Sequence, residues 1–93
     1  MAGNYLKIGM MWVKDKPKIT WEQSINDAYM YYVSKYGHKP DRCYLHPSVL
    51  EKDVGGILIS TFAERGLSIE SVPYIMKNCL WMGVEERENY RDN

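Results

Sequence analysis

Residues 20–37 read TWEQSINDAYMYYVSKYG, and this stretch decides the fold because its structure can be predicted directly from its pattern. Apolar and aromatic side chains recur here at the spacing that gathers them on one side of an α-helix. The residues of this stripe are Trp21, Ile25, Ala28, Tyr29, Tyr32, Val33 and Tyr36. A helix with one such stripe must bury it, so we expect the other elements to pack around it.

Both ends of this predicted helix carry recognisable signals. Thr20 and Gln23 match a capping box, in which the threonine hydroxyl accepts a hydrogen bond from a backbone N–H of the first turn. At the other end, Gly37 can adopt the left-handed conformation that closes many helices, and Pro40 follows shortly after it. These signals predict a helix over residues 20–36.

Extended segments are predicted on either side of this helix. In residues 5–13, YLKIGMMWV, one face of the extended chain is fully apolar, and the other face includes Tyr5 and Met11. After the helix, residues 42–46 read RCYLH and predict a short strand that ends before Pro47. If these two strands are parallel neighbours, their connection should cross over right-handedly and lay the helix on one sheet face.

Residues 47–66 are the hardest part of the chain to assign. Pro47 is suited to the first position of a short helix, and the pair Gly55 and Gly56 marks a break after it. The following ILISTFAERG begins with β-branched residues, which favour a strand, but it ends at Gly66, which can stop a helix. We favour a helix for this segment.

Two further strands complete the predicted fold. Residues 67–72 alternate in polarity, whereas residues 79–85 are apolar on both faces, which is typical of a strand that is central or covered on both sides. The sequence therefore predicts one small α+β domain, β-α-β-(α)-β-β, over residues 1–93, with a mixed sheet and the helix at 20–36 packed on one face. The charged residues 86–93 are expected to form a frayed tail.

The composition is that of an ordinary folded protein with no excess of charge. Hydrophobic residues make up 45% and charged residues 26%, and 12 basic residues balance 12 acidic ones. Proteins that bind nucleic acid or anionic membranes usually carry a basic surplus, so its absence weighs against both partners. No apolar run approaches the roughly 20 residues that a membrane-spanning helix needs.

The cysteine content and the first residues suggest a location. Cys43 and Cys79 are too few for a disulfide framework. The opening MAGNYLKIG lacks the charged region and the apolar run of a secretory signal. We therefore expect the protein to lie in a reducing cytoplasm.

Only one set of residues has the chemistry of a soft-metal site: His38, Cys43, His46 and Cys79. The spacing argues against it, because Cys43 and His46 are three residues apart and an odd separation on a strand sends side chains to opposite faces. The simpler interpretation is that the two cysteines are small core residues, and we predict no metal.

Catalytic motifs are missing as well. The chain has no GxSxG, no phosphate-binding loop and no GxGxxG. The same odd spacing weakens Cys43 and His46 as a nucleophile and base, since that pair needs hydrogen-bond contact. We therefore expect no enzymatic activity and no cofactor.

Aromatic residues are the less usual feature, with eight tyrosines and three tryptophans in 93 residues. Such side chains are favoured at interfaces, because they bury large rigid surfaces while their polar tips stay satisfied. On the helix, Met30 and Tyr31 lie off the buried stripe, which indicates either a second contact or two exposed residues without a role. The sheet face away from the helix is the other candidate surface.

These observations predict a small binding or self-associating module that contacts a partner protein or a second copy of itself. The contact candidates are Met30, Tyr31, Tyr5, Met11, Tyr44 and His46. The alternative is a nucleic-acid-binding accessory protein, in which a basic edge lies beside tyrosines that stack on bases. That edge would consist of Lys14, Lys16, Lys18, Lys39 and Arg42.

Overall fold

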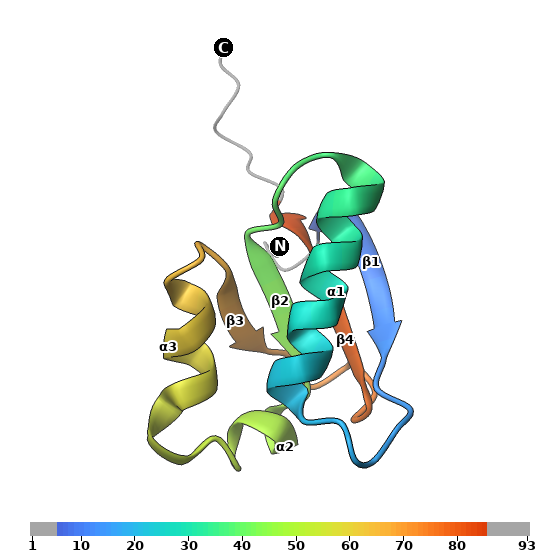
Figure 1. The fold of residues 1–93 in the computed structure, drawn as a ribbon. Helices are drawn as coiled ribbons and strands as arrows, with labels where there is room; N and C mark the ends of the chain where they lie inside the picture. Colours follow the sequence, from blue (N-terminus) through green and yellow to red (C-terminus); the bar gives the residue numbers. More distant parts are fainter. Residues whose placement is uncertain (1–5, 86–93) are drawn as a thin grey trace.

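The computed structural model describes residues 6–85, in which helices cover one face of a four-stranded sheet (Figure 1). In chain order the elements are β1 (Leu6–Val13), α1 (Trp21–Tyr36), β2 (Arg42–Leu45), α2 (Pro47–Leu50), the 3-10 turn η1 (Val54–Gly56), α3 (Ile57–Ala63), β3 (Ser68–Ser71) and β4 (Cys79–Glu85). The predicted α+β class, with a mixed sheet and the main helix on one face, is confirmed. The tail predicted at 86–93 lies outside the described residues.

Helix α1 forms where its caps and apolar stripe predict it. The Gln23 N–H donates to Thr20 Oγ1 at 3.1 Å, which satisfies one amide of the first turn. Gly37 adopts a left-handed φ of 77°, and its N–H donates to the Val33 carbonyl at 2.9 Å. The middle of the stripe is buried, with Ile25 and Tyr32 fully inaccessible.

The sheet order is β1-β4-β2-β3, so the last strand in sequence lies inside the sheet. β4 is antiparallel to both of its neighbours, whereas β2 and β3 are parallel. Of the two arrangements that the sequence left open for residues 79–85, a central strand or one covered on both sides, the structure has the central one. β1 and β2 run parallel but are not neighbours, because β4 fills the space between them.

The core lies between the sheet and the helices α1 and α3, which cover the same face (Figure 1). The pairing register places Met10 opposite Met82, Met82 opposite Cys43, and Cys43 opposite Ile69. Residues opposite each other in a sheet share a face, so this row points at the helices. Phe62 of α3 completes this cluster and is fully buried.

The region between β2 and β3 is helical, as predicted. α2 begins at Pro47, and Gly55 and Gly56 have left-handed φ angles of 71° and 68° before α3. A residue with a side chain is strained in that conformation, which explains why two glycines separate the helices. Gly66, also left-handed with a φ of 79°, follows α3 as predicted.

The sheet face opposite the helices is only partly open. Residues 72–79 cover the part of this face that β2 forms. There Val72, Ile75 and Cys79 pack on Tyr44, which is only 2% exposed. Tyr44, one of the contact candidates, is therefore covered by this chain itself, because the connection to β4 supplies its own apolar side chains. No helix within residues 6–85 has the length and hydrophobicity needed to cross a membrane.

Candidate protein-contact surface

Large apolar side chains remain exposed around β1, on both sides of the sheet. On the open face, Met11 and Trp81 are 56% and 43% exposed, and Val13 lies beside them. On the helix side, Tyr31 of α1 is 48% exposed. We call these four residues, together with the outer edge of β1, the β1 surface.

The register of the sheet explains why the open-face residues gather. Met11 of β1 is paired with Trp81 of β4, so the two side chains leave the sheet side by side. Val13 is two residues further along β1 and therefore projects from the same face. Between β1 and β4 the described chain leaves these side chains exposed, because residues 72–79 bury Tyr44 over β2 instead.

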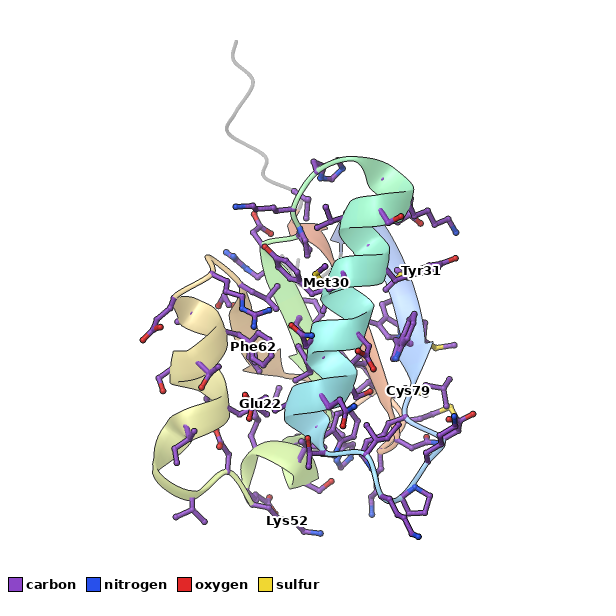
Figure 2. All side chains as sticks on the ribbon, viewed as in Figure 1. Glu22, Met30, Tyr31, Lys52, Phe62 and Cys79 are labelled. Carbon is purple, nitrogen blue, oxygen red and sulfur yellow. The ribbon has the colours of Figure 1, made fainter. Side chains whose placement is uncertain are left out.

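Tyr31 reaches β1 from the other side. Its ring centroid lies 5.4 Å from that of Trp12, with the planes tilted by 51°. Figure 2 shows Tyr31 on the side of α1 that faces β1, whereas Met30 is labelled over the middle of the sheet. The Lys35 ammonium lies 5.9 Å from the Tyr31 ring centroid, so a positive charge borders the aromatic pair.

The backbone of β1 presents hydrogen-bonding groups at its outer edge. The Lys14 N–H donates to the Asn78 carbonyl at 2.8 Å, which fixes which residues face β4. In an antiparallel ladder alternate residues face the same neighbour, so Met10 and Trp12 also bond toward β4. Gly9, Met11 and Val13 direct their N–H and C=O groups outward, and within residues 6–85 no strand pairs with them.

The remaining contact candidates have different surroundings. Met30 is 60% exposed on α1. His46 is partly buried and caps α2, because its Nδ1 accepts from the Ser48 N–H at 3.1 Å. Tyr44 is buried, as described above, and Tyr5 lies outside the described residues. Of the six candidates, Met11 and Tyr31 therefore belong to the β1 surface.

Trp81 was missed as a contact residue. In CLWMGVE, alternation places Cys79, Trp81 and Gly83 on one face of the strand, but both faces read as apolar. The sequence alone did not show which of these two faces the helices would cover. The pairing of Trp81 in β4 with Met11 in β1 supplies this information, because paired residues share a face of the sheet.

The residues considered for metal binding lie in separate places. Cys43 belongs to the core under the helices and Cys79 to the cluster around Tyr44, and both are free thiols. The His38 ring packs edge-on against Tyr32, with centroids 5.5 Å apart. Within residues 6–85 no three His, Cys, Asp or Glu side chains form a potential metal site. Burial raises the pKa of the Cys43 thiol far above its usual value.

The basic residues do not form one continuous edge. Lys14, Lys16 and Lys18 precede α1, and Lys39 and Arg42 follow it, so the two groups are separated by the length of α1. A helix of 16 residues is about 24 Å long. Arg42 is also engaged locally, because its Nε lies 3.4 Å from the Glu70 carboxylate.

A hollow of about 350 Å³ lies between the end of β1 and the start of α1. It is lined by Trp12, Val13, Lys14, Asp15, Lys16, Ile19, Ser24 and Asp27. Its charged rim mixes lysine and aspartate, so the hollow does not favour a ligand of either charge. It adjoins the β1 surface at Trp12 and Val13.

Comparisons of the chain with protein-family models, with curated proteins and with solved structures gave no match.

Proposed function

We propose that the protein is a small non-enzymatic binding module that contacts protein through the β1 surface. The observation that carries this proposal is the coincidence of two features at one edge of the sheet. Exposed apolar side chains flank β1 on both faces, and the strand between them offers backbone groups with which no strand of residues 6–85 pairs. A protein partner can satisfy both at once, since strand addition pairs the backbone while flanking side chains are buried.

Other exposed apolar residues lack this combination. Val54, Ile57 and Ile59 are exposed around the start of α3, but the backbone there is a turn and a helix. Scattered apolar residues are normal on protein surfaces and need no partner. Ile57 is 62% exposed and therefore serves as a control position for substitutions in the β1 surface.

The nucleic-acid alternative receives less support. Phosphate contacts need several cations that follow the backbone of the ligand, and here the basic residues stand at the two ends of α1. Titration with single-stranded nucleic acid at low salt tests this alternative directly. Tight binding that weakens steeply with salt would replace the proposal made here.

Cross-linking in the cells that express the protein tests the contact. Lys14 follows β1 and Lys35 lies beside Tyr31, so both flank the β1 surface, whereas Lys52 follows α2. We expect intermolecular links to concentrate on Lys14 and Lys35 relative to Lys52. The variant Trp81→Lys should lose these links, and Ile57→Lys should keep them. Equal links in both variants would overturn the proposal.

The expected cytoplasmic location belongs to the same proposal. Both cysteines are free thiols, and the two lie in different clusters of buried residues. A fold of this kind requires no oxidising compartment, because neither thiol needs a disulfide partner. Imaging of the tagged chain tests this location.

A further inference from the structure

We infer that the partner on the β1 surface is a second copy of this chain, whose β1 pairs antiparallel with the first across a two-fold axis at Met11. This inference rests on the proposed function, since it names the occupant of the same surface. The result would be one continuous eight-stranded sheet formed from two four-stranded sheets.

The occupant of the outer edge of β1 must be a strand. Gly9, Met11 and Val13 present N–H and C=O groups at regular two-residue intervals along the outer edge. Only an extended backbone matches this spacing over its whole length. A helix or a flat side-chain surface would leave most of these groups without a protein partner.

Between Ile8 and Val13, the outer edge of β1 lacks the charge and proline that commonly prevent sheets from joining at their edges. Lys7 lies at the register shift between Leu6 and Ile8, before this regular stretch. Edge strands are commonly protected by charge, proline or short length. Residues 8–13 read IGMMWV, with no charge and no proline. The opposite edge, β3, has only four residues and carries Glu70, which is exposed. Two copies of this chain also do not repel each other, because the net charge is zero.

The two ends of the regular edge fix the register of the pairing. The β1–β4 pairing shifts between Leu6 and Ile8, which ends the regular edge on one side, and Val13 is the last residue of β1 on the other. Antiparallel pairing that keeps both faces aligned and joins all the outward groups places Met11 opposite itself. Gly9 then lies opposite Val13 in both directions, so a small residue faces a branched one.

The paired strands need side chains beside them to form a stable interface. A stable interface typically covers about 800 Å² on each partner, more than the backbone of five edge residues supplies. The exposed side chains of the β1 surface add to the area that the paired backbones bury. Trp81 and Met11 extend the contact on the open face, and Tyr31 with Trp12 extends it on the helix side. Aromatic anchors beside a paired edge are the residues expected to dominate the binding energy.

The self-pairing of Met11 makes the inference testable with opposite charges. Met11→Lys and Met11→Glu each place two like charges face to face across the axis, so each variant alone should sediment as a monomer. Mixed together, the two variants place unlike charges opposite each other and should form a one-to-one dimer. The wild-type chain should sediment at twice its mass of 10.9 kDa at high concentration.

The matched pair Ile57→Lys and Ile57→Glu should remain dimeric alone and in mixture, because α3 packs beside β3, at the opposite edge of the sheet (Figure 1). A wild-type chain that stays monomeric at millimolar concentration overturns the second-copy inference, even if the Met11 variants do not fold. That result would not bear on the proposed contact with a different protein, which the cross-linking experiment tests separately. A dimer that the Met11 variants do not disturb would overturn the register and the edge.

Discussion

One carboxylate, that of Asp53, holds the start of α3 from across a turn. The Asp53 carboxylate accepts hydrogen bonds from the Leu58 N–H at 2.8 Å and the Ile59 N–H at 3.4 Å. The residue that directly precedes α3 is Gly56, which has no side chain to perform this role. Asp53 therefore caps α3 from across the η1 turn, and satisfies two amides of its first turn.

Replacing Asp53 by alanine should lower the free energy of unfolding by about 1 kcal/mol, because those two amides lose their acceptor. Asp53→Asn retains an acceptor oxygen and should lose less. Urea denaturation of the three proteins measures the difference. An alanine variant as stable as the wild type would show that the cap contributes nothing.

The Cys43 thiol makes stability depend on alkaline pH. Burial raises the pKa of Cys43, so the folded chain keeps a proton that the unfolded chain releases above the usual value of 9.0. Stability is therefore fully present below about pH 9 and falls as pH rises beyond it, by about 1.4 kcal/mol per pH unit. Burial, with smaller contributions from Tyr36 and Asp41, also raises the pKa of Tyr32, in the same direction.

Comparison of the wild type with Cys43→Ala isolates the thiol. The variant should unfold more easily at neutral pH, because a buried side chain is shortened, but its stability should decline less steeply between pH 9 and 10. Chemical denaturation at a series of pH values provides both curves. Parallel curves would mean that Cys43 ionises in the folded protein as readily as in the unfolded one.

At the level of elements, α1 has one buried side and one side that reaches β1. Met30 is mostly exposed, so Met30→Lys should change the free energy of unfolding by less than about 0.5 kcal/mol. Tyr31→Lys removes the ring contact with Trp12 and should cost about 1 kcal/mol. Thermal and urea unfolding measure both effects. A Met30 variant that unfolds would show that α1 is buried on two sides.

The elements differ in how far the sequence predicts them. α1 was predicted with its caps because Thr20, Gly37 and the apolar stripe act within one segment of chain. The order of the strands was not, since the insertion of β4 between β1 and β2 joins residues far apart in sequence. Local patterns record the face and period of a strand but not its neighbours.

The candidate site was predictable in part for the same reason. Met11 and Tyr31 were found from parity and from the helical wheel, which depend on one element each. Trp81 and the burial of Tyr44 depend on which sheet face residues 72–79 cover. That coverage is a property of the assembled fold, so it appears only in the structure.

For the whole molecule, the balance of charge predicts how association responds to salt. The β1 surface is apolar and the net charge is zero, so few ionic contacts would be screened on pairing. Dimerisation should therefore stay constant or strengthen from low to molar ionic strength. Sedimentation across a salt series measures this. A steep loss with salt would point instead to an ionic interface.

The proposed dimer forms through the outer edge of β1, and hydrogen exchange measures that edge residue by residue. The amides of Met10 and Trp12 bond toward β4 and should be protected at any protein concentration. The amides of Gly9, Met11 and Val13 should exchange rapidly in dilute protein and become protected in concentrated protein, as two copies of β1 pair. If these three amides exchange at the same rate at every concentration, the edge does not pair with a second copy.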